Sequence, residues 1–516
     1  MVLLRCSAFL EFVGRWIVLL RLWPLLVASL VISMGLTPAF RNVGVRLKVL
    51  DTAHDLRRVH SRPVPRLGGL AIVLGTFGGI AAGLVIPVVR AAILEDGWSI
   101  FGLMLGGLFV AAAGLYDDVM GARATKKLAV EIVAAALLYA AGFRILAIDN
   151  PFGGDIELGP FSLPVTLLWI AGVANAMNLI DGLDGLAGGV AVFGAGAICV
   201  LGVRVGDPTT VVMALAVAGG VLGFLVYNVS PASVFMGDTG SLFLGTMLAA
   251  LALRPHDDLA LSVPLTAMSV VLGIPILDTL LAIGRRAARN APLFSGDREH
   301  LHHRLLDRGL SPRAAVVALW SVSALLATAG VHMAPGRDPR GRAVIFSAVI
   351  LISLILLSIL GYFRRPDAAM RERRRRNRER LNGVRAVSLR LRHASSVEDV
   401  YRLVRTVAPV FGAQAARLRN ARPSSEVPGR RLFPLDPSDL ASRLVELEWS
   451  PEHQLDRDTE VAIEILCRGT SSVLDRLERR NVAAPPQAAP QARRRDLPVP
   501  ARALSGQQHL APPSLH

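Results

Sequence analysis

The sequence predicts an all-α, polytopic membrane protein with about 11 transmembrane helices, followed by a small soluble C-terminal domain and a disordered tail. Hydrophobic residues make up 52% of the 516 residues and charged residues only 19%, which is too apolar for a soluble protein of this length. Apolar runs near the ~20 residues that cross a ~30 Å hydrocarbon core recur up to about residue 363. After that point the composition changes abruptly.

The apolar runs set the predicted spans, whose ends are defined to within several residues. They lie at 15–39, 67–89, 99–116, 127–148, 161–177, 187–203, 209–228, 239–254, 262–284, 314–333 and 343–363. The first run could also be a secretory signal. Arg21 and Pro24 interrupt it, however, and no good cleavage site follows, so we interpret it as a span.

Basic residues in the short loops predict the orientation. Loops 41–66 and 285–313 each carry seven Lys or Arg, whereas loops 149–160 and 255–261 carry none; 334–342, with three arginines, is a mild exception. The basic loops and the C-terminus are therefore expected in the cytoplasm, in a bacterial-type inner (plasma) membrane. The net charge of +16 follows these loops and one tail, which suits anionic membrane lipid and not nucleic acid.

The C-terminal third predicts a separate unit. The transmembrane domain is expected to span 1–363, an arginine-rich connector 364–383, a small cytoplasmic domain of α+β type 384–480, and a disordered tail 481–516. Ser396 is placed to cap an amphipathic helix, and a second amphipathic helix is expected over about 458–477. The domain weakly resembles a degenerate GAF-type sensory domain.

Two carboxylate clusters fall on the predicted cytoplasmic edge. Asp117 and Asp118 end the third span, and Lys126 and Lys127 follow. Adjacent carboxylates beside an apolar wall usually bind a cation or keep a proton, although a solvated loop would also place them there. Asp238 opens the eighth span at the partially positive end of a helix, where simple capping is the alternative to a functional role.

A glycine-rich run, 175–189, forms a third cluster on the same edge. Asn178, Asp181 and Asp184 recur three residues apart in it, so a helical turn would point them one way. Its glycines permit close approach of a ligand to the backbone. A turn between two spans is the alternative reading.

A histidine motif in the 285–313 loop is the fourth cluster. Its members are His300, His302, His303 and Arg304. Bidentate arginine with histidine suits a pyrophosphate better than zinc. Asp278, inside the ninth span, is a further candidate, with a structural hydrogen bond as the alternative. All four clusters are expected on one membrane face.

Together these motifs resemble the polyprenyl-phosphate N-acetylhexosamine-1-phosphate transferase family, glycosyltransferase family 4, over roughly 45–330. The matching motifs are Asp117–Asp118 with a downstream lysine, the 178–187 run, Met236–Ser241 and His300–Leu305, with 59–69 as the first cytoplasmic loop. The peptidoglycan branch, which transfers phospho-N-acetylmuramoyl-pentapeptide, typically has an uninterrupted histidine triplet. Leu301 interrupts it here, as in the branch that starts O-antigen, teichoic-acid and other cell-surface glycans.

The resemblance implies a reaction that initiates cell-envelope polysaccharide synthesis. N-acetylglucosamine-1-phosphate, or a related N-acetylhexosamine-1-phosphate, would pass from a UDP-N-acetylhexosamine to undecaprenyl (polyprenyl) phosphate, with release of UMP. Mg²⁺, with Mn²⁺ as a substitute, would bridge the donor pyrophosphate. Direct attack is favoured over a covalent aspartyl intermediate, and a homodimer is left open.

The resemblance also implies roles for individual residues. The metal ligands would be Asp238 and Asp181, and Asp117 and Asp118 would position or deprotonate the lipid phosphate. The catalytic set is Asp117, Asp118 and Asp181. The substrate-binding set is Lys127, Asn178, Asp184, His300, His302, His303 and Arg304.

Two other classes of function remain open. A lipid-linked sugar transporter would also be polytopic and basic, but it would place polar groups near the bilayer midplane. A membrane sensor would work through its soluble tail and would need no carboxylate set in its spans.

Overall fold

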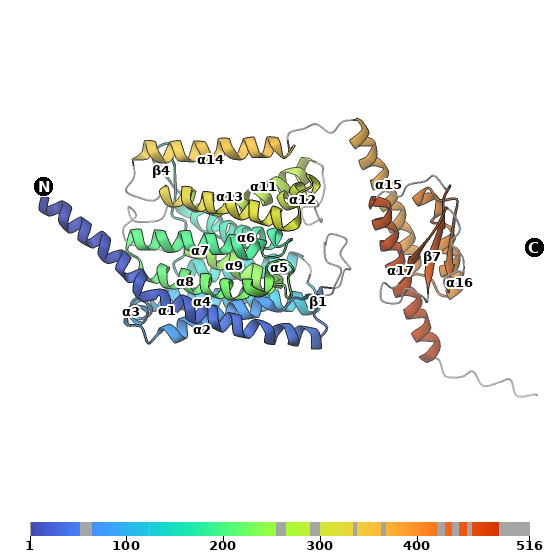
Figure 1. Cartoon of the computed structure of the whole chain (residues 1–516), viewed down its shortest axis with the longest axis horizontal. Coiled ribbons are helices and arrows are strands. Elements are labelled where there is room, and N and C mark those ends of the chain that lie inside the picture. Colours follow the sequence, from blue (N-terminus) through green and yellow to red (C-terminus); the bar gives the residue numbers. More distant parts are fainter. Residues whose placement is uncertain are drawn as a thin grey trace, which may run out of the picture. The chain divides into compact units, whose positions relative to one another are not determined.

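The computed structural model is predominantly helical and divides into two compact units, Met1–Arg365 and Pro366–His516 (Figure 1). The structure describes residues 2–51, 64–122, 124–253, 265–288, 300–333, 338–362, 368–420, 429–435, 443–450 and 457–483. We describe each unit by itself.

Each predicted span coincides with a helix or a pair of helices in the first unit. These are α1 (Val2–Arg46), α2 (Gly68–Gly83) with α3 (Pro87–Glu95), α4 (Gly97–Met120), α5 (Ala124–Ala140), α6 (Ser162–Ile180), α7 (Leu186–Val205), α8 (Pro208–Asn228), α9 (Gly237–Leu251), α10 (Leu265–Val271) with α11 (Gly273–Ala288), α13 (Pro312–His332) and α14 (Pro339–Ile359). A short helix, α12 (Leu301–Asp307), precedes α13.

The helices differ in their ability to cross a membrane. In the described part of the chain, seven are long and apolar enough, or up to nine if each bent pair counts as one span. The bends are 105° between α2 and α3 and 86° between α10 and α11. Helices α5 and α9 have only 17 and 15 residues. The chain is therefore a multi-pass membrane protein, and the count of eleven crossings stays a prediction.

The helix bundle has an apolar surface and closely packed helices, and both features are typical of membrane proteins. Leucine and isoleucine side chains on α14, among them Leu351, Ile352 and Ile355, are exposed. A soluble protein rarely presents so continuous an apolar face. Inside, a Cβ added at Gly219 of α8 would lie 2.4 Å from the Leu26 carbonyl oxygen of α1. Small residues that let helix backbones approach this closely are typical of membrane interiors.

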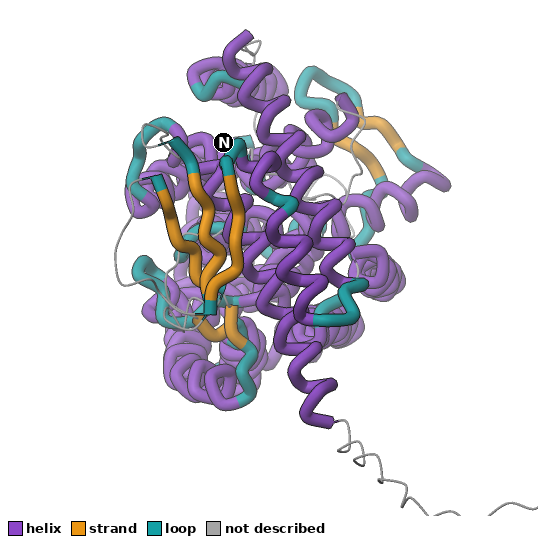
Figure 2. The backbone as a smooth tube through the Cα atoms, turned by 90° about the vertical axis from the view of Figure 1, so that its right-hand side faces the viewer, coloured by secondary structure: helices purple, strands orange, loops and turns teal. Residues whose placement is uncertain are grey.

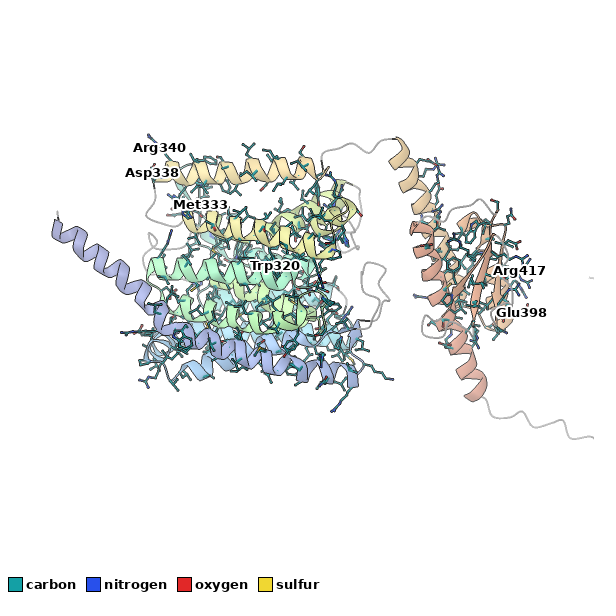
Figure 3. The ribbon with its side chains drawn as sticks, in the orientation of Figure 1. Trp320, Met333, Asp338, Arg340, Glu398 and Arg417 are labelled. Atoms are coloured by element: carbon teal, nitrogen blue, oxygen red, sulfur yellow. The ribbon has the colours of Figure 1, made fainter. Side chains whose placement is uncertain are left out.

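Local signals in the sequence explain several helix starts. Asp207 caps α8 by accepting hydrogen bonds from the backbone of Thr209 and Thr210, and Pro208 occupies the first turn. Ser311 caps α13 in the same way. Trp320 of α13 (Figure 3) packs against Gly189 of α7, where any side chain would collide with the indole.

The first unit also contains two short antiparallel β pairs. Strand β1 (Leu50–Asp51) pairs with β2 (Val64–Pro65), and β3 (Ala147–Asp149) pairs with β4 (Asp155–Glu157).

The second unit combines helices with a three-stranded antiparallel sheet, visible in Figure 2. The sheet order is β5–β7–β6, from Ala415–Arg419, Leu444–Glu448 and Arg430–Pro434; the helices are α15 (Ala368–Arg392), α16 (Val397–Arg405) and α17 (Arg457–Ala483). One hydrophobic core, including Val404, Val445 and Leu466, joins them.

Both helices that the sequence predicted in the second unit are confirmed. Ser396 caps α16 in a capping box with Asp399, and α17 covers the predicted second amphipathic helix. The predicted boundary between residues 383 and 384 falls inside α15, so part of the predicted connector is helical. The predicted disordered tail lies outside the described residues from residue 484 onward.

Candidate functional site

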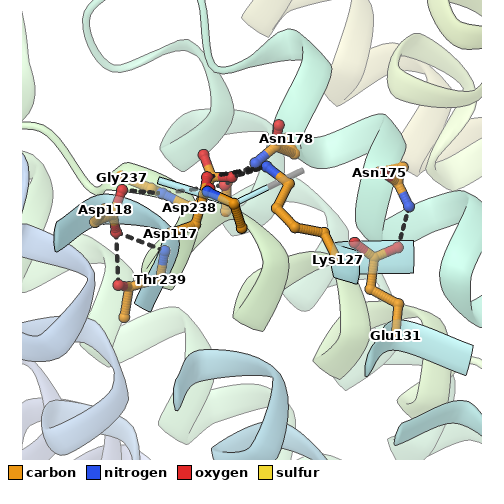
Figure 4. A network of polar contacts seen from close by, with 11 residues as sticks. Asp117, Asp118, Lys127, Glu131, Asn175, Asn178, Gly237, Asp238 and Thr239 are labelled. Carbon is orange, nitrogen blue, oxygen red and sulfur yellow. Dashed lines mark hydrogen bonds and ion pairs between the residues drawn. The ribbon is translucent and has the colours of Figure 1, made fainter. Parts of the chain in front are cut away.

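Ends of four helices meet where the predicted carboxylate clusters lie (Figure 4). Lys127, in the first turn of α5, lies between a carboxylate of α4 and one of α9. Its Nζ is 3.1 Å from Asp117 Oδ2 and also forms a close ion pair with Asp238 Oδ2. Asp117, Lys127 and Asp238 are each about a fifth exposed, at 18%, 21% and 24%, so a ligand can reach them. Lys126 is exposed, which supports the assignment of Lys127 to the site.

Asp118 has a different environment from Asp117. Its Oδ1 accepts a hydrogen bond from the backbone N–H of Asp238 at 2.9 Å, and its Oδ2 accepts from the Thr239 N–H at 3.0 Å and hydroxyl at 2.7 Å. The N-cap residue of α9, Met236, makes no side-chain hydrogen bond to the start of that helix. Asp118 of α4 therefore supplies the cap that the free N–H groups of α9 require.

Gly237 makes this cap sterically allowed. Its φ of +65° is a left-handed conformation that favours glycine, and an added Cβ would lie 2.5 Å from Asp118 Oδ2. Since Asp118 caps α9, Asp238 does not act as the cap. The Asp238 carboxylate instead faces Lys127, which removes the capping explanation for this residue.

The prediction that Asn178, Asp181 and Asp184 share a helical turn is wrong. Helix α6 ends at Ile180, Asp181 is its C-terminal cap residue, and a turn follows because Gly182 and Gly185 favour non-helical backbone; Gly185 has a φ of +78°.

The three side chains consequently separate. Asn178 Nδ2 donates to Ser241 Oγ of α9 at 3.0 Å, so it joins the carboxylate cluster. Asp181 lies at the end of α6, on the turn. Asp184 is buried, and its Oδ2 accepts from the Ala232 N–H at 2.9 Å, in the loop before α9.

Asp278 anchors the histidine motif. The buried carboxylate is 2.9 Å from His300 Nδ1 and accepts a hydrogen bond from the Leu301 N–H at 2.9 Å. These contacts support the structural role for Asp278, that of a hydrogen-bond acceptor. It fixes the start of α12 to α11.

The histidine motif contacts the turn after α6. An added Cβ at Gly182 would lie 2.6 Å from His302 Nε2, so the imidazole packs directly on that turn. The rings of His302 and His303 are 4.2 Å apart, and those of His300 and His302 are stacked at 5.8 Å. Burial, assisted by the neighbouring His303, lowers the pKa of His302 to about 3. His302 is therefore neutral near pH 7, and Arg304 on the same helix carries a permanent positive charge.

Comparison with known proteins identifies the family. A model described as glycosyl transferase family 4 matches residues 100–256. A Bacillus subtilis protein named a probable undecaprenyl-phosphate N-acetylglucosaminyl 1-phosphate transferase is 33% identical over 346 residues, which cover 67% of this chain and 90% of that protein. The chain belongs to glycosyl transferase family 4. The resemblance drawn from the sequence motifs is thereby confirmed.

Other relatives of this family 4 member carry two kinds of name. A decaprenyl-phosphate N-acetylglucosaminephosphotransferase of Mycolicibacterium smegmatis is 35% identical over 335 residues, covering 61% of this chain and 82% of that protein. A phospho-N-acetylmuramoyl-pentapeptide-transferase of Shouchella clausii is 34% identical over 292 residues, covering 52% of this chain and 83% of that protein.

Two residues of this family 4 site were missed by sequence reasoning. Glu131 lies one turn after Lys127 on α5, is 3% exposed, and accepts a hydrogen bond from Asn175 of α6 (Figure 4). Its spacing from Lys127 and its place inside a predicted span could have indicated it. Tyr362, beyond α14, packs against Arg304 and Arg285. No local motif indicates a contact so distant in sequence.

The carboxylates fit a partly protein-bound Mg²⁺. Within the described ranges, no group of three or more His, Cys, Asp or Glu is arranged to hold a metal ion. Asp117 and Asp238 do converge on one cation, the Lys127 ammonium. Mg²⁺ usually takes only one or two carboxylates and completes its shell with water and substrate phosphates, so two converging carboxylates are compatible with this ion.

Proposed function

We propose that this family 4 member transfers N-acetylglucosamine-1-phosphate, or a related N-acetylhexosamine-1-phosphate, from a UDP-sugar to undecaprenyl or another polyprenyl phosphate. The observation that carries the proposal is the meeting of Asp117, Lys127 and Asp238 from three helices at one reachable point. The names of the Bacillus and Mycolicibacterium relatives support this donor and acceptor class. The interrupted histidine motif supports the same branch.

The reaction is a direct phosphoryl transfer. An oxygen of the polyprenyl phosphate attacks the sugar-bearing phosphorus, a new P–O bond forms, and the bond to the bridging oxygen breaks so that UMP leaves. A phosphate monoester with a second pKa of ~6 is largely ionised at neutral pH, so no strong base is needed. The main task of the site is to bring two anions together.

Each side chain has a part in that task. Lys127 counters the phosphate charge, Asp117 positions the lipid phosphate, and Asn178 orients the donor. Asp238, together with Asp181 as the family resemblance implies, would hold Mg²⁺ or Mn²⁺, which supplies charge neutralisation at the donor pyrophosphate when bound. Arg304 binds donor phosphates, and the neutral His302 contributes hydrogen bonds.

Two predicted site residues take structural roles in this proposal. Asp118 fixes the first turn of α9 and thereby places Asp238, because its three hydrogen bonds all go to that turn. Asp184 holds the turn after α6 to the loop before α9 through the Ala232 N–H. Neither residue needs to contact substrate for the transfer to proceed.

A radiochemical assay tests the proposed reaction. Membranes holding the protein receive polyprenyl phosphate, Mg²⁺ and a panel of UDP-sugars. The expected result is one lipid-linked sugar product with stoichiometric UMP from a UDP-N-acetylhexosamine. Turnover of only UDP-N-acetylmuramoyl-pentapeptide would favour the second candidate, which the Shouchella relative supports. An absence of turnover with any donor would favour transport or sensing.

We also place the site on the cytoplasmic face of the inner membrane, because the described ends of the two basic loops, with Arg66, Arg285 and Arg304, lie at this end. Exposed positions allow a labelling test in a cysteine-free background. Lys126→Cys and Asp307→Cys should react with an impermeant thiol reagent only from the cytoplasm, and Asp155→Cys only from outside. The reverse pattern would invalidate this orientation.

A further inference from the structure

Tyr362 joins the end of the last span to the histidine motif. Its ring centroid is 4.7 Å from Arg304 Cζ of α12 and 5.6 Å from Arg285 Cζ of α11. Close by, Arg308 of α12 donates a hydrogen bond to the Ile359 carbonyl at the end of α14. The end of α14 and Tyr362 after it thus contact α11 and α12, the helix that carries the histidine motif.

The chemistry of this contact suits an anion-binding arginine. The Tyr362 phenol is neutral near pH 7, and burial raises its pKa further, to about 12. Its contacts with both guanidinium groups are of the cation–π type, and a side-chain hydrogen bond with Arg285 accompanies them. An aromatic ring that stacks on the face of a guanidinium group restrains the orientation of that group. The N–H groups at the edge of the guanidinium keep the geometry that binds phosphate oxygens bidentately.

The positions of Arg304 and Arg285 indicate binding of the nucleotide-sugar donor. Arg304 follows His302 and His303, and His302 packs on the Gly182 turn beside Asp181. Arg285 lies in the last turn of α11, the helix whose Asp278 anchors His300. One aromatic ring therefore restrains two arginines on the two helices that hold the histidine motif.

We propose that Tyr362 is a positioning residue that holds Arg304 and Arg285 for the pyrophosphate of the nucleotide-sugar donor. Donor affinity then depends on the three described residues that follow α14, of which Tyr362 is the last. The inference rests on the proposed function, and it adds Arg285 to the donor site.

The test compares three variants of the full-length chain. Tyr362→Ala removes the ring, and Tyr362→Phe retains it. Tyr139→Ala is the matched control, because Arg144 Cζ lies 4.7 Å from the Tyr139 ring in an equivalent contact at the opposite end of α5. The measurements are kcat, the KM for the UDP-sugar, the KM for polyprenyl phosphate, and UDP affinity by calorimetry.

We expect Tyr362→Ala to raise the donor KM and weaken UDP binding ~10-fold, equivalent to ~1.4 kcal/mol. The acceptor KM and kcat should stay within about twofold, which a general loss of packing would not allow. Tyr362→Phe should restore most of the donor affinity, and Tyr139→Ala should leave it unchanged.

The outcomes separate this inference from the proposed function. Unchanged UDP affinity in Tyr362→Ala, or an equal effect on both substrates, overturns the positioning role. If the parental protein binds UDP but turns over no UDP-sugar, the proposed reaction is wrong, and the UDP affinities alone decide the role of Tyr362. A parental protein that neither binds UDP nor turns over overturns both.

Discussion

Asp118 and Asp238 lie next to each other, but their carboxylates bind different groups. We therefore expect a structural role for Asp118 and a chemical role for Asp238. The Asp118 carboxylate is engaged by the N–H groups and hydroxyl at the start of α9. The Asp238 carboxylate faces the Lys127 ammonium. The same substitution at the two positions should therefore have different effects.

Asp238→Asn is expected to lower the transfer rate ~100-fold or more, while insertion and melting temperature stay close to parental. Loss of the anionic oxygen removes the proposed metal ligand and a partner of Lys127, which corresponds to several kcal/mol in the barrier. Raising Mg²⁺ should restore part of the rate. Asp118→Asn is the comparison: its one remaining acceptor oxygen cannot serve both the Asp238 and the Thr239 N–H groups, so its defect should appear as a lower melting temperature and should not be restored by Mg²⁺. Equal rates for the two variants across a magnesium titration would contradict the assignment.

His302 should make stability depend on pH. Its pKa in the folded protein is about 3, below the ordinary value of 6.5. Above pH 6.5 both folded and unfolded states hold neutral imidazole, so this group contributes no pH dependence. Below pH 6.5 the unfolded state binds a proton that the folded state does not, and stability falls by about 1.4 kcal/mol per pH unit.

The measurement is the melting temperature of detergent-solubilised protein between pH 7.5 and 5.5. His302→Gln should show a shallower decline than the parental chain, since other groups titrate alike in both proteins. Parallel curves would show that His302 is not buried in its neutral form.

At the scale of elements, the site depends on how the turn after α6 meets α12. Gly182 is the point of contact, because an added methyl group would lie within 2.6 Å of His302 Nε2. The His302 imidazole would have to move away from the turn, which changes where it can reach a donor.

Gly182→Ala should therefore raise the donor KM at least ~10-fold, a change of ~1.4 kcal/mol in apparent donor binding. Gly172→Ala on α6 is the control, because nothing lies within 4 Å of a Cβ added there. Steady-state kinetics on both variants gives the comparison. An unaltered donor KM in Gly182→Ala would mean that His302 does not bind the donor.

Hydropathy located the long helices of the described membrane unit, because lipid exposure selects for apolar side chains along the whole span, but it did not locate the short helix α12. It did not reveal the bends after Gly83 and Val271, because a bent pair has the same composition as a straight helix. The motifs predicted that Asp117, Lys127 and Asp238 lie on one membrane face, and in the structure the three side chains are in contact. The cap from Asp118 and the contacts of Tyr362 depend on tertiary packing between distant segments, so local spacing could not predict them.

For the whole molecule, the chain ending at Arg365 is expected to insert and to turn over at close to the parental rate. The two compact units divide between Arg365 and Pro366, and every proposed site residue, including Tyr362, precedes that point. A cut at residue 383 would be a poorer test because it leaves part of α15 without α17, against which it packs.

A chain ending at Leu360 provides the contrast: it lacks Tyr362, so its donor KM should rise ~10-fold while its acceptor KM does not. Insertion can be checked by membrane fractionation before the kinetics. A normally inserted chain ending at Arg365 with no turnover would show that the second unit belongs to the catalytic machinery.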